Sequence, residues 1–404
     1  MKIGRLEADF GNSTNNFLVD GYYFELTTSV AEISKQDAER MFVSPITEKK
    51  ELLDRIMIST GEGENEKFYL VGKFAEGHEI KSHVNTMNDK IHSIIPYASF
   101  LAAISYYNTI KAEDTDNEVE IDSMMMMLPI WLLKRAEKFS IAQNEMANRF
   151  IGEHKVKVLT MGMEKEIKIK VKNSQCKIEG EVARFALKYR MVQEESNTIK
   201  IEKRKEIEMF QNFETVLCDV GGGSTDCVLL VKGLTAPKER DSFKVIDIEP
   251  FLGKLETFRK EKLLQYFSNV KELESFIVRN YSKQKYILED LNTGKTYDFT
   301  KQIVEMLQEY ANKLITQIFS AFRKKDRVVK FIYFGGETPI LKPYMKNSLL
   351  NIITEKALEE NHLFLDELFN DENSEIFKPT PRTINLASLE ILSVNQLGRK
   401  NEQQ

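Results

Sequence analysis

Two short glycine-rich segments carry the residue types needed to bind a polyphosphate. The first, Asp9 to Thr14, reads DFGNST, and the second, Asp219 to Asp226, reads DVGGGSTD. Closely spaced backbone N–H groups in such turns can point at one anion, and glycine lets the backbone approach it closely. An aspartate at the head of each turn could hold hydrated Mg²⁺ against phosphate oxygens. The segments therefore predict a site for a triphosphate with magnesium; two ordinary polar hairpin turns are the alternative.

Both turns are expected to lie between strands. The predicted strands are Ile3 to Ala8 and Phe17 to Val19 around the first turn, and Thr215 to Cys218 and Cys227 to Val231 around the second. Asp20-Gly21 predicts a further tight hairpin turn, which leads into a strand over Tyr22 to Leu26. A P-loop or dinucleotide-binding turn would instead run into a helix and show G-K-[ST] or G-x-G-x-x-G. The repeated strand–turn–strand pattern indicates an internal duplication, with one copy in each domain.

Two further segments also resemble each other. Glu118 to Leu128 is predicted to be a strand that ends at Pro129, followed by a helix from about Ile130 to Phe150. Val328 to Phe334 is predicted to be an apolar strand, followed by Gly335-Gly336 and the start of a helix. The four consecutive methionines of the earlier strand are expected to fill the core, because methionine adapts to irregular gaps.

Three other segments are predicted from composition. Glu194 to Glu208 alternates positive and negative charges, which indicates the solvated face of a helix. Asp371 to Pro381 is polar and contains proline, so it is expected to be a linker. A last helix is expected near Ile384 to Leu397, with a frayed tail from Gly398 to Gln404.

Composition limits the class of protein. The chain has 404 residues, 42% hydrophobic and 29% charged, with a net charge of −5, which suits a globular protein of two domains. The chain has no excess of basic residues, so direct binding to nucleic acid is not expected. The longest apolar run, Met124 to Leu133, is interrupted by Pro129 and is too short to span a membrane, so we expect a cytoplasmic protein. Three cysteines and five histidines without metal-ligand spacing make a disulfide framework or a zinc site improbable.

Together these motifs resemble the actin/Hsp70/sugar-kinase ATPase superfamily. The two turns and the strand ending in Gly-Gly match its phosphate-one, phosphate-two and adenosine motifs, in that order and spacing. Tyr69 to Ala75 (YLVGKFA) is similar to the V-G-x-x-A segment of ParM-type actins, and Leu128-Pro129 resembles their L-P element. Asn385 stands where they often carry N-x-x-G, although Ser388 replaces the glycine. The closest resemblance is to plasmid-segregating actins of the ParM/Alp type.

This resemblance implies an α/β, actin-like ATPase fold with two duplicated domains around a nucleotide cleft. Domain I is expected at residues 1–180 and 378–404, and domain II at residues 181–377. By motif, phosphate would be contacted by Asp9, Gly11, Asn12 and Ser13 from domain I, and by Asp219, Gly221, Gly222, Gly223 and Ser224 from domain II. Asp9 and Asp219 would hold Mg²⁺, mainly through water. Adenosine would lie against Gly335, Gly336 and Glu337, and Lys260 and Glu261 resemble a helix beside the base and ribose, with a solvated helix face as the alternative.

The resemblance also implies a polar residue that orients the attacking water. Glu179 is the candidate, because CKIEGEVA (residues 176–183) resembles the P-E-x-x-x-A segment of ParM-type proteins. Glu181 is the second choice, and either residue could instead be a carboxylate favoured by a helix dipole. One departure concerns charge: many relatives end the first phosphate turn with lysine, where this chain has Asn16. Backbone groups or another cation would have to replace that charge.

The implied function is a slow, Mg²⁺-dependent ATPase that polymerises and segregates plasmid DNA. The chain would bind DNA only indirectly, through a centromere-binding adaptor, and no membrane partner is expected. The sequence leaves ATP and GTP both open. The main alternative is a monomeric phosphotransferase or phosphatase of the same superfamily, similar to exopolyphosphatases or sugar kinases, but Asp226 stands where exopolyphosphatases have glutamate. An Hsp70-like chaperone would need a peptide-binding domain for which no residues remain, and neither terminus resembles the amphipathic membrane helix of many cell-shape actins.

Overall fold

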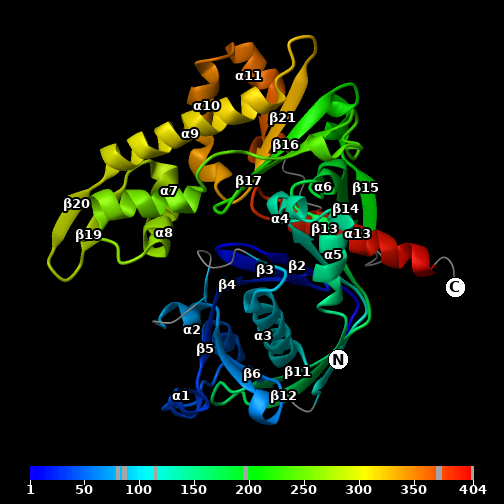
Figure 1. The fold of residues 1–404 in the computed structure, drawn as a ribbon, viewed down its shortest axis with the longest axis vertical. Helices are drawn as coiled ribbons and strands as arrows, with labels where there is room; N and C mark the ends of the chain where they lie inside the picture. The colour runs from blue at the N-terminus through cyan, green and yellow to red at the C-terminus, as the bar shows by residue number, and fades with distance from the viewer. Residues whose placement is uncertain (79–81, 84–88, 113–115, 194–198, 370–374, 402–404) are drawn as a thin grey trace. The chain divides into compact units, whose positions relative to one another are not determined.

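The computed structural model describes residues 1–78, 82–83, 89–112, 116–193, 199–369 and 375–401. The chain forms two compact units (Figure 1). The first contains Met1–Val182 and Asn385–Gln404, and the second contains Ala183–Ile384. The polypeptide therefore leaves the first unit once and returns to it with its last helix, α13 (Ile384–Asn401).

Each unit contains a five-stranded sheet with the same topology. In the first unit the strand order is β13 (Ser174–Ile178), β10 (Met124–Leu128), β2 (Leu6–Phe10), β3 (Thr14–Val19) and β4 (Tyr22–Thr27). In the second it is β22 (His362–Phe364), β21 (Val329–Phe334), β16 (Glu214–Val220), β17 (Thr225–Leu230) and β18 (Phe243–Val245). In both sheets the first three strands are parallel, and the last two are antiparallel to their neighbours. This repeat confirms the expected duplication.

The parallel strands β10 and β21 lie inside their sheets, between two neighbouring strands, and are buried on both faces. Every residue of β10 and of β21 is buried, as expected for strands that are covered on both sides. The four methionines Met124 to Met127 are at most 1% exposed, which confirms that they fill the core.

The first unit also contains a mixed eight-stranded sheet. Its order is β1 (Lys2–Ile3), β9 (Glu118–Ile121), β12 (Lys165–Val171), β11 (Gly152–Val158), β6 (Ile56–Thr60), β7 (Lys67–Val71), β5 (Ser29–Ile33) and β8 (Ser82–His83). Helix α3 (Ile94–Lys111) packs against one face of this sheet (Figure 1). The shorter helices α1 (Lys35–Arg40) and α2 (Lys73–Glu76) cover part of the other face, where Ala38 and Ala75 contact Met57 and Leu70.

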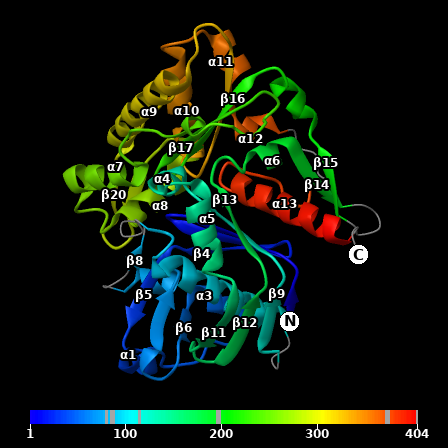
Figure 2. The same ribbon diagram turned by 45° about the vertical axis from the view of Figure 1, so that its right-hand side comes forward.

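The second unit contains seven helices among its described residues: α6 (Arg184–Lys188), α7 (Phe251–Phe258), α8 (Val270–Asn280), α9 (Thr300–Phe322), α10 (Thr338–Leu350), α11 (Glu355–Asn361) and α12 (Leu365–Leu368). Of these, α10, α11 and α12 contact β21 of the five-stranded sheet. Two small hairpins, β14 (Tyr189–Gln193) with β15 (Ile199–Lys203) and β19 (Ile287–Asp290) with β20 (Lys295–Asp298), also belong to this unit. Figure 2 shows α9 and α10 side by side. None of the helices described is both long and apolar enough to cross a membrane.

Two predictions near residue 130 are wrong in detail. Glu118 to Leu128 is not one strand: it breaks at Asp122 and Ser123 into β9 and β10, which belong to different sheets. Asp122 forms an ion pair with Lys172 at 2.8 Å, so a charged side chain marks the break. The helix predicted after Pro129 is divided into α4 (Ile130–Arg135) and α5 (Phe139–Asn148), because Ala136 has an extended backbone conformation.

The helix predicted over Glu194 to Glu208 is also wrong. Residues 194–198 lie outside the described residues, and Ile199–Lys203 forms strand β15, which pairs with β14. Ile199 and Ile201 alternate with charged residues at a period of two, which is the spacing of a strand. Part of the predicted linker, residues 371–374, lies outside the described residues. Its next residue, Glu375, forms an ion pair with the buried Arg204.

A buried carboxyl group joins the first unit's sheet to its C-terminal helix. Glu7 on β2 is fully buried, and burial, together with the nearby charge of Glu390 on α13, raises its pKa to about 8. Arg5 forms an ion pair with Glu390 at 2.9 Å. Glu7 is therefore mainly protonated at neutral pH in the folded protein, whereas it ionises near pH 4.5 when unfolded.

Glu7→Gln should remove a pH-dependent loss of stability. Between pH 4.5 and pH 8 the unfolded chain releases the Glu7 proton and the folded chain keeps it. The free energy of unfolding therefore falls as pH rises through this range, by on the order of 4 kcal/mol from this group. Urea unfolding at pH 5, 7 and 8 should show that the free energy of unfolding of the variant rises relative to that of the wild type at each higher pH. Glu153→Gln, on the exposed surface of β11, is the control. An equal change in the pH dependence of unfolding for both variants would contradict the raised pKa of Glu7.

Candidate active site

The first glycine-rich segment forms the turn between β2 and β3. Strand β2 extends beyond its predicted end, so Asp9 lies within it, opposite Asn16 on β3. The turn contains only Gly11, Asn12 and Ser13, all partly exposed. A side chain at Gly11 would collide with the carbonyl oxygen of Thr14. The structure therefore brings the four predicted phosphate contacts of this unit together in one hairpin, and the close approach of the backbone explains the glycine.

Asn16 contributes a neutral side chain next to this hairpin. It is 3% exposed, and its Oδ1 accepts a hydrogen bond of 3.0 Å from the hydroxyl of Tyr23 on β4. A lysine would not be held in this way, because it cannot accept a hydrogen bond. A positive charge for phosphate would have to come from another residue.

The second glycine-rich segment forms the turn between β16 and β17. Asp219 and Asp226 are also strand residues and lie directly opposite each other. The N–H of Gly221 donates to the carbonyl oxygen of Ser224 at 3.0 Å, which closes the turn. The carbonyl of Gly222 accepts a hydrogen bond of 2.9 Å from the N–H of Leu252 in α7. The predicted residues Gly221 to Ser224 therefore form a single tight turn that α7 supports.

The Gly335-Gly336 segment lies directly against the second turn. Gly335 has a φ of +101°, and a Cβ there would lie 2.5 Å from the carbonyl oxygen of Val220 and 2.6 Å from Oδ1 of Asp219. The N–H of Glu337 donates to the same Val220 oxygen at 3.1 Å. Within the second unit, the structure therefore brings the predicted adenosine and phosphate-two residues together at the carboxyl ends of β21 and β16. Ligands of α/β sheets commonly bind at such an edge.

Glu337 is a buried carboxyl group at this edge. Burial, with a contribution from the negative charge of Glu274, raises its pKa to about 8. Its Oε1 lies 3.0 Å from the position that a Cβ of Gly222 would take. Because Glu337 is mainly neutral at pH 7, it can lie beside a polyphosphate without strong repulsion.

Lys260 and Glu261 lie just after α7, the helix that supports the second turn. They belong to a π-helical turn, Arg259–Leu263, that continues α7. The side chain of Lys260 is 63% exposed and forms an ion pair with Glu256 at 3.2 Å. The hydrogen bonds seen among the described residues do not connect this turn to Gly335 or to the second glycine-rich turn. Contact of these two residues with a nucleotide stays a prediction.

Glu179 lies at the carboxyl end of β13, on the same sheet edge as Asp9. Its N–H donates to the carbonyl oxygen of Leu128 at 2.9 Å, which extends the pairing of β13 with β10. The N–H of Gly180 donates to Oδ1 of Asn385 at 3.3 Å. Asn385, which the sequence links to the N-x-x-G motif, thus holds the backbone next to Glu179.

Two cations near these segments were not identified from the sequence. The ammonium group of Lys90 lies 3.8 Å from Oε2 of Glu179. In the second unit, Arg382 lies close enough to Glu337 for its charge to lower the pKa of that carboxyl group, and the neighbouring Pro381 accepts a hydrogen bond of 2.8 Å from the N–H of Gly335. Neither cation belongs to a recognisable motif, because each reaches its partner through contacts distant in sequence.

The carboxylates suit magnesium that is held mainly through water. In the part of the chain that the structure describes, no group of three or more His, Cys, Asp or Glu side chains could hold a metal ion. Asp9 and Asp219 come from different strands of different sheets. Mg²⁺ commonly keeps several waters and is bound by one or two carboxylates together with substrate phosphates. Each carboxylate taken singly therefore fits a hydrated ion that phosphates also bind.

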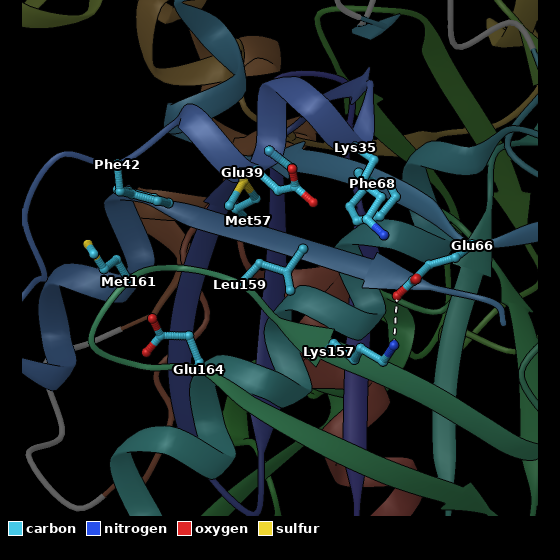
Figure 3. A pocket seen from close by; sticks show the side chains of 11 residues that line it. Lys35, Glu39, Phe42, Met57, Glu66, Phe68, Lys157, Leu159, Met161 and Glu164 are labelled. Atoms are coloured by element: carbon cyan, nitrogen blue, oxygen red, sulfur yellow. Dashed lines mark hydrogen bonds and ion pairs between the residues drawn. The ribbon is translucent and has the colours of Figure 1, made fainter. Parts of the chain in front are cut away.

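A separate pocket lies on the eight-stranded sheet of the first unit (Figure 3). It has a volume of about 360 Å³ and lies between α1 and strands β6, β7 and β11. Phe42, Met57 and Leu159 are among its apolar lining residues, and an ion pair of 2.8 Å joins Lys157 to Glu66 at its side. No predicted site residue lines this pocket, so it is distinct from the glycine-rich turns.

Comparison with known proteins gives both a family and a fold. Residues 214–368 match the family model described as the Alp7A C-terminal domain. A crystal structure of the actin-like protein Alp7A is 42% identical, with a TM-score of 0.86, and the match covers 100% of this chain and 99% of that one. A search of curated proteins gives no match.

More distant structures share the fold. Bacillus thuringiensis ParM with ATP is 15% identical over 97% of this chain and 98% of that one, with a TM-score of 0.61. A 15-stranded ParM filament from Clostridium botulinum is also 15% identical, over 99% and 100% of the two chains, with a TM-score of 0.61. These likenesses confirm the expected α/β, actin-like fold.

Proposed function

Because the chain belongs to the Alp7A family of actin-like proteins, we propose that it is a cytoplasmic ATPase that polymerises and segregates plasmid DNA. The observation that carries the proposal is the repeated five-stranded sheet, with an aspartate and a glycine-rich turn at equivalent places in both copies. The structures of ParM with ATP and of a ParM filament support the proposal at the level of a shared fold.

In this proposal each turn contacts the phosphates of ATP through backbone N–H groups. Gly11, Asn12 and Ser13 contribute from the first unit, and Gly221 to Ser224 from the second. Gly335, Gly336 and Glu337 would lie against the adenosine. Asp9 and Asp219 would hold hydrated Mg²⁺, which neutralises charge on the phosphate oxygens when it is bound.

Glu179 would orient the water that attacks the terminal phosphate. Phosphoryl transfer depends mainly on positioning and on charge stabilisation, so one fixed carboxylate can set the rate. Slow hydrolysis would then accompany assembly, and subunits with ADP would leave the filament more readily.

The partners in this proposal are further copies of the chain and an adaptor bound to DNA. A head-to-tail contact that does not close into a ring produces an open filament. The net charge of −5 disfavours direct binding to DNA, so a basic adaptor at the plasmid centromere would connect the filament to DNA.

Sedimentation of the purified protein tests this proposal. We expect pelletable polymer with Mg·ATP, and much less with ADP or without nucleotide. Gly222→Val is the control, because a Cβ at this position would already lie 2.9 Å from the side chain of Leu252, so the turn should be displaced and polymer lost. If light scattering stays flat with Mg·ATP well above micromolar protein, with and without a crowding agent or adaptor, a monomeric phosphotransferase becomes the better explanation.

A further inference from the structure

Lys90 is a buried lysine in the first unit that forms an ion pair with Glu179. Its side chain is 4% exposed, and its Nζ lies 3.8 Å from Oε2 of Glu179. This distance corresponds to an ion pair without a direct hydrogen bond. Oε2 is itself buried and has no hydrogen-bond partner among the described residues. Because a buried ammonium group requires a compensating charge, each member of the pair stabilises the other.

The backbone that carries Lys90 is held by α5. The ring of His92 lies between Asp89, at 2.5 Å, and Glu145 of α5, at 2.9 Å. Arg149, at the end of α5, donates to the carbonyl oxygen of Lys90 at 3.4 Å and to the following carbonyl at 2.7 Å. These contacts leave Lys90 little freedom to change its position.

The same helix also fixes the strand that carries Glu179. Gln143 of α5 donates a hydrogen bond of 2.8 Å to the carbonyl oxygen of Cys176 on β13. Since α5 contacts both the Lys90 segment and β13, it ties together the two backbone segments that carry the ammonium group and the carboxylate.

We propose that Lys90 is a positioning residue for ATP hydrolysis, which acts by holding the carboxylate of Glu179 in one orientation. The ammonium group attracts the buried Oε2, while 22% of the Glu179 side chain remains exposed and can reach water. Asn16 supplies no positive charge to this edge of the sheet, and Lys90 brings one. The inference rests on the proposed function, because it assigns a role within that reaction.

Lys90→Met should lower kcat and leave the KM for ATP almost unchanged. A carboxylate that is no longer held in place would orient water poorly, and such misplacement costs about 10- to 100-fold in rate. Both constants are obtained from the rate of phosphate release by the full-length protein. The rate is divided by the amount of protein that sediments. Lys90→Arg keeps the charge and should recover most of kcat. In the Glu179→Gln background, Lys90→Met should cost less than about twofold, because its effect passes through Glu179.

Lys157→Met is the matched control. Lys157 lies in the same unit, pairs with one carboxylate, Glu66, at 2.8 Å and lines the separate pocket (Figure 3), so kcat should not change. The proposal is overturned if Lys90→Met leaves kcat unchanged, raises KM more than about tenfold, or slows the Glu179→Gln protein as much as the wild type.

Thermal unfolding of the nucleotide-free protein gives an independent test. Lys90→Met should lower the midpoint, because it leaves the buried Oε2 of Glu179 without its counter-charge, and adding Glu179→Gln should restore part of the loss. Strictly additive effects would show that the two residues do not interact and would overturn the proposal. If the wild type hydrolyses no ATP, the proposed function fails. The unfolding midpoints of the single and double variants still decide whether Lys90 fixes Glu179.

Discussion

Glu179→Ala should bind ATP as the wild type does and hydrolyse it at least about 100-fold more slowly. A removed general base or water-orienting group typically costs two or more orders of magnitude. The side chain lies at the carboxyl end of β13 and not in either glycine-rich turn, so nucleotide binding should be preserved. A fluorescent ATP analogue measures affinity, and phosphate release measures the rate.

Glu181→Ala is the control for this prediction, since Glu181 is the second candidate and lies only two residues further on. The backbone at Glu179 is fixed on both sides: its own N–H donates to Leu128, and the next N–H donates to Asn385. If Glu179→Ala hydrolyses ATP at the wild-type rate and Glu181→Ala does not, the role belongs to Glu181.

The parts of the fold that local chemistry determines could be predicted from the sequence. Asp20 and Gly21 both have positive φ values, 46° and 86°, as the two central residues of a type I′ turn require. The strands around both glycine-rich turns were also predicted, but the strand predicted over Ile3 to Ala8 is wrong in detail: it breaks at Gly4 and Arg5 into β1 and β2, which belong to different sheets. The strands next to the turns extend further toward them than predicted, because cross-strand pairing continues through Asp9 and Asp219.

The features that the sequence did not reveal depend on distant contacts. Asp122 interrupts a predicted strand where it pairs with Lys172, and this partner cannot be recognised from neighbouring residues. Lys90 carries no motif, because α5 and β13 bring it to Glu179. The charged segment Ile199–Lys203 could form a solvated helix or an edge strand as judged from its own residues, and its pairing with β14 makes it a strand.

The two adjacent glycines of the adenosine motif should respond very differently to substitution. Gly335→Ala should lower the free energy of unfolding by about 3 kcal/mol or more, because its Cβ would meet the backbone of Val220 and the carboxylate of Asp219 within 2.6 Å and its φ of +101° is strained for any side chain. Gly336→Ala should change it by less than about 1 kcal/mol, because nothing lies within 4 Å of an added Cβ. Urea unfolding measures both.

The same pair of variants also tests the assignment of the second phosphate turn. If Gly335→Ala folds at low temperature, the most direct relief of the collision is a displacement of Asp219, so affinity for Mg·ATP should fall together with stability. Gly336→Ala leaves Asp219 in place, and any loss of affinity in that variant must arise from contact with the nucleotide itself. Equal losses of stability in the two variants would contradict the packing of Gly335 against β16, and full affinity in a folded Gly335→Ala protein would separate Asp219 from nucleotide binding.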